Sequence, residues 1–174
     1  MSAGVPDWHH VELAIASGDI ARLEEIAAMR DGFPAGGDPV MGPWISMFAG
    51  GPPDLLRWAL ARGALVDPPA EDGFPPLHAA IDAEAPHICD NLAILIEAGA
   101  DLGRHGFNDW TPLHFAAARG NLDAVRLLLD AGADPTIRTR IDDFATPEEE
   151  ARMLGQTAAA DLIRDHVRAS GRRR

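Results

Sequence analysis

Residues 110–134 read WTPLHFAAARGNLDAVRLLLDAGAD. Thr111 is a suitable N-cap, because its hydroxyl can accept a hydrogen bond from the first turn of a helix. Pro112 fits the first helical position, where the missing N–H costs nothing. Gly120 and Gly132 each allow the left-handed turn that ends a helix. Apolar residues between these glycines recur at helical spacing, namely Leu122, Val125, Leu128 and Leu129. The stretch therefore predicts a helix, a tight turn and a second helix.

The same pattern recurs along the chain. Pro112 follows Pro76 by 36 residues, whereas Gly132 follows Gly99 by 33, so three extra residues lie between the helices of the earlier unit. Because neither helix of a pair can bury its apolar face alone, we expect the pairs to stack. We predict a single domain over residues 1–174 with about five units, approximately at residues 8–36, 37–69, 70–105, 106–140 and 141–167, followed by a frayed basic tail at 168–174.

Two tryptophans align with apolar positions of the clearest unit. Trp44 aligns with Leu113, and Trp58 aligns with Leu127. We therefore expect both indole rings to pack in the core.

Residues 111–117 (TPLHFAA) and 127–134 (LLLDAGAD) resemble the ankyrin repeat. The resemblance implies an all-α repeat fold, an ankyrin-like solenoid of stacked helix-turn-helix units joined by hairpin loops. It also implies that His78 and His114 bridge backbone and threonine groups of neighbouring repeats. The last unit departs from the pattern at residues 148–150, where three glutamates displace the Leu-His pair.

The charge of the chain bears on its partners. With 47% hydrophobic and 24% charged residues the composition is that of a soluble globular protein. The formal net charge of −12 argues against nucleic acid as a partner, since phosphate binding depends on lysine and arginine. A basic protein surface would be attracted instead. All 15 cationic residues are arginine, which together with the many Ala, Gly and Pro residues suggests a GC-rich bacterial gene.

The cysteine content and the first residues indicate a cytoplasmic location. A single cysteine, Cys89, excludes an internal disulfide and a cysteine-based zinc site, as expected in a reducing compartment. The first residues lack the order of a signal peptide, and no apolar run is long enough to span a bilayer.

No pattern in the sequence indicates catalysis. We find no phosphate-binding glycine loop, no nucleophile elbow and no His-Glu-x-x-His spacing. The adjacent His9 and His10 do not share a helix face, so we expect no metal site there. We therefore expect no enzyme, no catalytic residue, no cofactor and no bound metal.

The residue before each Thr-Pro position is the best candidate for contact with a partner. In three consecutive units this residue is Met41, Phe74 or Trp110. The resemblance implies that it lies on the exposed inner surface near the hairpin tips, and exposed aromatic residues mark binding hot spots. The alternative is that these side chains pack against adjoining hairpins and stiffen the loops. The remaining candidates for this surface are Asp72, Asp82, Arg104, His105, Phe107, Asn108, Arg119, Asp142 and Asp143.

These features favour a non-catalytic protein–protein interaction module. We expect it to bind its partner through the concave surface of hairpins and first helices, and to be monomeric when free. An immunity protein or stoichiometric inhibitor that neutralises a basic toxin or enzyme is an alternative, since the chain is small and acidic. A self-associating structural protein is a third.

Overall fold

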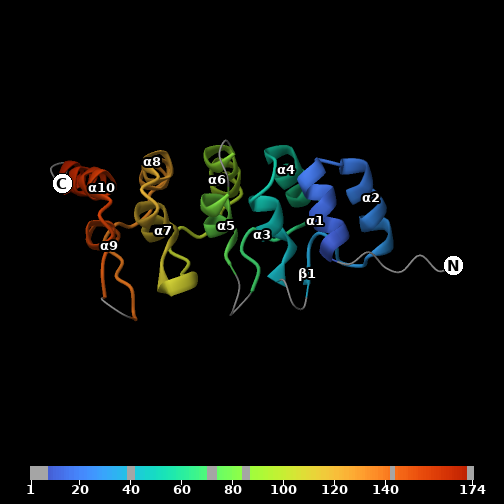
Figure 1. The fold of residues 1–174 in the computed structure, drawn as a ribbon, viewed down its shortest axis with the longest axis horizontal. Coiled ribbons are helices and arrows are strands. Elements are labelled where there is room, and N and C mark those ends of the chain that lie inside the picture. The colour runs from blue at the N-terminus through green and yellow to red at the C-terminus, as the bar shows by residue number, and fades with distance from the viewer. Residues whose placement is uncertain (1–7, 39–41, 70–73, 84–86, 142–143, 172–174) are drawn as a thin grey trace. The chain divides into compact units, whose positions relative to one another are not determined.

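The computed structural model describes residues 8–38, 42–69, 74–83, 87–141 and 144–171. The chain forms two compact units, Met1–Gly99 and Ala100–Arg174, each of which contains more than one of the predicted repeats (Figure 1). They are described in turn. Both consist mainly of short helices joined in antiparallel pairs, as the sequence predicts. Among the described residues, no helix combines the length and the hydropathy needed to cross a bilayer.

The first unit contains three helix pairs within its described residues. The first helices of the pairs are α1 (Trp8–Ser17), α3 (Trp44–Ala49) and α5 (Pro76–Asp82), and the second helices are α2 (Ile20–Met29), α4 (Pro53–Ala61) and α6 (Ile88–Glu97). Helix α3 packs against α5, and α4 packs against α6, so consecutive pairs stack in register. Two-residue strands, β1 (Gly37–Asp38) and β2 (Gly42–Pro43), pair antiparallel ahead of α3.

An aromatic cluster fills the core of the first unit. The Phe33 ring lies 5.5 Å from the Trp44 ring and 6.0 Å from the rings of Phe48 and Trp58, measured between centroids. Trp44 is buried, as predicted. Trp58 is only half-buried, and its Nε1 donates a hydrogen bond to the Glu24 carboxylate at 2.8 Å. The Trp58 indole therefore packs against the aromatic cluster on one side and binds the Glu24 carboxylate on the other.

A buried amide connects the second and third helix pairs. The Asn91 side chain lies in α6, and its Nδ2 donates to the carbonyls of Ala49 at 2.9 Å and Gly51 at 2.7 Å. Ala49 is the last residue of α3 and Gly51 follows it, where helix-terminal acceptors lack partners in their own helix. Gly51 has a second constraint, because a Cβ there would lie 2.8 Å from the Ile15 side chain. The amide thus fixes how α6 meets the end of α3.

The second unit contains two helix pairs within its described residues, and they stack on each other. Its helices are α7 (Pro112–Ala118), α8 (Leu122–Asp130), α9 (Pro147–Met153) and α10 (Thr157–Gly171), with a 3-10 turn η1 at Phe107–Asp109. Helix α7 packs against α9, and α8 packs against α10. The predicted N-cap and both predicted stops are confirmed, since Thr111 caps α7, and Gly120 and Gly132 adopt positive φ values of 66° and 95°.

The last helix pair replaces buried apolar side chains by charged ones. Ala117 and Leu129 are buried in the preceding pair. Thirty-five residues later, Arg152 and Arg164 occupy the corresponding places, and both guanidinium groups contact the carboxylate of Asp161, at 3.2 Å and 2.6 Å. This polar substitution fits the face that a terminal repeat presents to water.

We predict that Gly132→Ala lowers the free energy of unfolding by about 1–2 kcal/mol, because an L-residue with a Cβ is strained at positive φ. No atom lies within 4 Å of the Cβ position, so the loss reports backbone conformation alone. Gly132→Asn is the control, since asparagine tolerates this region better. Urea unfolding measures both variants. Equal stability of Gly132→Ala and the wild type would contradict the assignment of Gly132 as the left-handed helix stop.

For the buried amide, we expect Asn91→Ala to cost about 1–3 kcal/mol, because two carbonyls lose their donor and one of them is buried. Asn91→Asp should cost more, since a buried carboxylate would then face two carbonyl oxygens. Thermal and urea unfolding of the two variants test this order. If Asn91→Ala unfolds at the same urea concentration as the wild type, the amide does not hold the two helix pairs together.

Candidate protein-binding surface

Phe74 precedes α5 in the first unit. Its side chain is 37% exposed, and the ring lies 6.1 Å from the imidazole of His78 between centroids. The Phe74 carbonyl accepts a hydrogen bond of 2.7 Å from Ser46 Oγ, which belongs to the preceding helix pair. The backbone and one face of the ring are therefore fixed, while a third of the side chain remains accessible.

Trp110 occupies the same place in the second unit but is less accessible. Its indole is half-buried and lies 6.1 Å from the Phe115 ring between centroids. The guanidinium of Arg119 lies 5.2 Å from the same Phe115 ring, a distance suited to a cation–π contact. Trp110, Phe115 and Arg119 thus form one group of contacting side chains. Within it the Trp110 indole is partly covered.

Some predicted residues lie outside the described part of the chain. These are Met41, Asp72, Asp142 and Asp143, and the side chain of Phe107 also falls outside it. Phe74 and Trp110 belong to different units, so a continuous aromatic ridge stays a prediction. Among the other candidates, Asp82, Asn108 and Arg119 are exposed, and Arg104 and His105 are half-buried.

A buried carboxylate organises the loop before Trp110. The carboxylate of Asp109 accepts hydrogen bonds from the backbone N–H and the guanidinium of Arg140, with Nε at 3.0 Å, and it lies 3.1 Å from His105 Nδ1. These Arg140 hydrogen bonds hold the pKa of Asp109 below its usual value, against the opposing effect of burial. No local sequence pattern indicates this pair, because its members are 31 residues apart.

His114 has the bridging role that the family resemblance implies. Its imidazole is fully buried in α7, with Nδ1 2.8 Å from the Thr111 hydroxyl and Nε2 3.1 Å from the Ala145 carbonyl of the next repeat. Burial lowers the pKa of this imidazole, and the hydrogen bond to Ala145 opposes that shift only in part. The neutral ring donates through Nε2 and accepts through Nδ1, so it serves structure and not acid–base chemistry.

His78 lies in the same place in the first unit and is also fully buried. The residue equivalent to Thr111 is Pro75, whose ring has no hydroxyl, and α5 has no side-chain N-cap. The start of α5 is thus built differently, with the Phe74 ring against the imidazole.

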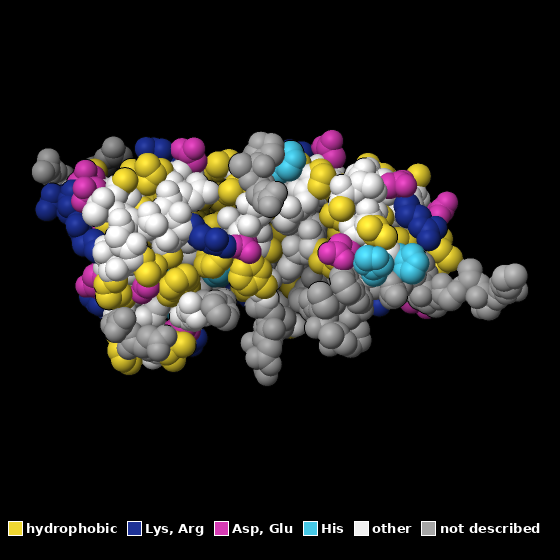
Figure 2. All heavy atoms as spheres, viewed as in Figure 1, with side chains coloured by type: hydrophobic (Ala, Val, Ile, Leu, Met, Phe, Trp, Pro, Cys, Tyr) yellow, Lys and Arg dark blue, Asp and Glu magenta, His cyan; other side chains and the backbone are white. Residues whose placement is uncertain are grey.

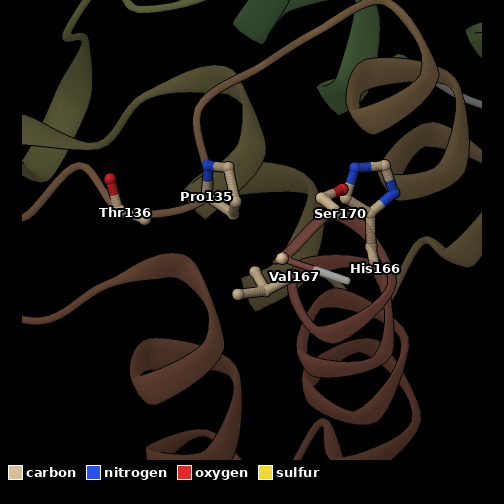
Figure 3. A pocket seen from close by; sticks show the side chains of 6 residues that line it. Pro135, Thr136, His166, Val167 and Ser170 are labelled. Carbon is tan, nitrogen blue, oxygen red and sulfur yellow. The ribbon is translucent and has the colours of Figure 1, made fainter. Parts of the chain in front are cut away.

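A shallow apolar cavity of about 380 Å³ lies beside the end of α10 in the second unit (Figure 3). Its described lining consists of Pro135, Thr136, His166, Val167, Ser170 and Gly171 and includes none of the predicted binding residues. Thr136 Oγ1 already donates to Asp134 at 2.6 Å. Over the described residues, no group of three or more His, Cys, Asp or Glu side chains is arranged to hold a metal ion.

We predict that wild-type stability falls between pH 7.5 and 5.5 by more than that of His114→Gln. The folded-state pKa of His114 is lowered, so the unfolded state binds the proton more readily, and the stability that the neutral ring contributes is lost as pH falls below about 6.5. Urea unfolding at the two pH values measures the difference.

The control is the interval from pH 7.5 to 9, in which imidazole does not titrate and both proteins should change alike. An identical loss of stability in wild type and variant between pH 7.5 and 5.5 would show that His114 is not held neutral.

Comparison with known proteins identifies relatives of the repeat region. A family model described as ankyrin repeats, in three copies, matches residues 45–139. The tyrosine-protein kinase Shark of Drosophila melanogaster is 36% identical over 111 residues, which are 63% of this chain and 11% of that protein. The putative E3 ubiquitin-protein ligase XBAT35 of Arabidopsis thaliana is 40% identical over 80 residues, 45% of this chain and 17% of the ligase.

A third relative, protein fem-1 homolog A of Danio rerio, is 35% identical over 118 residues, 62% of this chain and 19% of that protein. The match therefore spans only about a tenth to a fifth of each curated relative.

Proposed function

Since this chain belongs to the ankyrin-repeat family, we propose that it acts as a non-catalytic module that binds a partner protein through its hairpin loops and first helices. Ankyrin repeats are in general protein-interaction modules. The observation that carries the proposal is the state of Phe74, an accessible aromatic side chain on a backbone held by Ser46. Such rigid aromatic groups lose little entropy on binding and often dominate an interface.

In the second unit we propose Arg119 and Asn108 as contacts for the partner, because both are exposed and come from a first-helix end and a hairpin. The net charge of −12 favours a partner with arginine or lysine at the rim of its interface. We propose a monomer that works in the cytoplasm of a bacterial cell. The relatives compared above are eukaryotic, so this source rests on the composition of the chain.

The kinase and ligase names among the relatives belong to much longer proteins. We propose no such activity for the present chain, because the sequence holds no catalytic pattern, His78 and His114 are buried, and His114 bridges two repeats.

A stoichiometric inhibitor, for instance the immunity protein of a basic toxin, is the second candidate. The formal charge of −12 on 174 residues favours it, since a strongly acidic surface speeds association with a basic enzyme. A gene for a secreted toxin beside this one, and tight binding of its product, would separate this inhibitor from a general adaptor.

We predict that Phe74→Ala combined with Trp110→Ala abolishes capture of the partner from the native cell lysate, as judged by mass spectrometry. Removal of a hot-spot aromatic weakens binding by about 2 kcal/mol or more, which is more than tenfold. Leu65→Ala with Val167→Ala is the matched control, because these side chains are also exposed and apolar, one in each unit. Circular dichroism verifies that both double variants fold.

If both double variants retain the same partners as the wild type, the binding surface lies elsewhere. If the wild type captures no partner and light scattering shows a mass that rises with concentration, self-association replaces the proposed function.

A further inference from the structure

The last helix of the chain lacks the glycine at which the second helices of three other repeats end. Gly63, Gly99 and Gly132 follow α4, α6 and α8, with positive φ values of 88°, 91° and 95°. Thirty-five residues after Gly132 the sequence has Val167, and α10 continues through it to Gly171. A β-branched residue rarely adopts a positive φ, so no helix stop forms there. The last repeat therefore departs from the pattern at the residue that would end its second helix.

The extra length of α10 prolongs the side of the helix that packs. Helix α10 packs against α8, and its buried residues include Ala160 and Ile163. His166, Val167 and Ser170 follow Ile163 by three, four and seven residues, so they belong to the same side of the helix. In the 35-residue alignment they correspond to positions beyond the last residue of α8. This part of α10 therefore faces the loop after α8 instead of the helix.

The cavity of about 380 Å³ described above lies between these two segments. Figure 3 shows Pro135 and Thr136, from the loop after α8, on one side of the cavity and the side chains of α10 on the other. Its volume is at the lower end of the range of about 300–1,000 Å³ that is usual for small-molecule sites. The space suits a compact ligand.

Two polar side chains of the cavity wall keep their capacity for hydrogen bonds. Within the described part of the chain, neither the His166 imidazole nor the Ser170 hydroxyl forms a hydrogen bond or an ion pair with another residue. On the opposite wall Pro135 has no N–H, and the N–H and hydroxyl of Thr136 both donate to Asp134 Oδ1, at 2.8 Å and 2.6 Å. Acceptors therefore outnumber donors around the cavity, which favours a ligand that donates.

The charges beside the cavity balance. Asp134 precedes Pro135 in the sequence, and the hydrogen bonds from Thr136 hold the pKa of its carboxyl below the usual value, so the group is ionised at neutral pH. Arg168 follows Val167 and is exposed. Figure 2 shows arginine and acidic side chains intermixed over α10, at the upper left. Neither sign prevails among the described residues here, which favours a neutral ligand over an ion.

We infer that this cavity is a binding site for a small neutral aromatic compound that carries an N–H or O–H donor, such as an indole or a phenol. Pro135 and Val167 contact the ring, and the Ser170 hydroxyl or the His166 imidazole accepts the hydrogen bond. An aromatic ring with one polar group buries its apolar body and needs a partner for its donor. The walls include none of the predicted partner contacts, so this site goes beyond the proposed function and does not depend on it.

The first test is a titration of the isotope-labelled full chain with indole, followed by NMR. We expect saturable shifts of the amide signals of Thr136 and of residues 166–171. N-methylindole, which lacks the donor, should bind about threefold more weakly or worse. Ser170→Ala combined with His166→Leu removes both acceptors and should bind the two compounds alike. Met153→Ala, an exposed apolar residue elsewhere in the same unit, is the control and should keep the preference for indole.

The second test restores the glycine of the other repeats. Val167→Gly removes one wall of the cavity and favours an earlier end of α10, so we expect it to weaken indole binding about tenfold or more. Val167→Ala should weaken binding less, because alanine keeps the helix. Circular dichroism verifies that both variants fold.

Three outcomes would overturn the inference. The first is shifts that do not saturate or that have no maximum at the cavity, and the second is equal binding of indole and N-methylindole, or of indole by wild type and Val167→Gly. The third is a blocked tripeptide, acetyl-Gly-Trp-Gly-amide, that binds more tightly than indole, because the cavity would then take a side chain of a protein. None of these outcomes decides the capture of a partner through Phe74 and Trp110, so the proposed function stands or fails separately.

Discussion

The buried imidazole of His114 is the contact on which the second unit depends. It reaches the Thr111 hydroxyl at the start of α7 with one nitrogen and the Ala145 carbonyl of the next repeat with the other. Trp110 directly precedes Thr111, and Phe144 directly precedes Ala145, so the two hydrogen bonds of His114 hold the backbone next to both aromatic residues. A single neutral side chain thus sets the position of two loops that carry aromatic residues.

The loops are rigid for a second reason, because each is closed by its own hydrogen bonds. The Gly106 N–H donates to the Trp110 carbonyl at 2.8 Å in one loop, and Thr139 binds Ala145 in the next, while Asp109 joins the two loops through Arg140. Loops on a rigid scaffold can present side chains in one geometry and so bind without a large ordering cost. Such rigid loops would suit a stack of short helix pairs to the binding role proposed above.

Local patterns predicted the helix pairs well. Thr111 and Pro112 identify a helix start, and Gly132 identifies a stop, because caps and positive φ depend on neighbouring residues alone. No local pattern indicates the roles of Asn91 and Phe144, since the Asn91 amide bonds a carbonyl 40 residues away and Phe144 is distinguished by its positive φ of 49°. Whether Trp110 shares a binding surface with Phe74 or packs to stiffen its loop stays open in the sequence, and the half-buried indole lies 6.1 Å from the Phe115 ring between centroids.

We propose that the hairpin loops are the protein-binding surface of this chain. Hydrogen–deuterium exchange of the chain, alone and with a captured partner, tests that claim most directly. We expect slower exchange of the backbone amides of residues 104–110 and 136–146 when the partner is bound. Protection confined to the second helices of the pairs, such as α8 and α10, would contradict it.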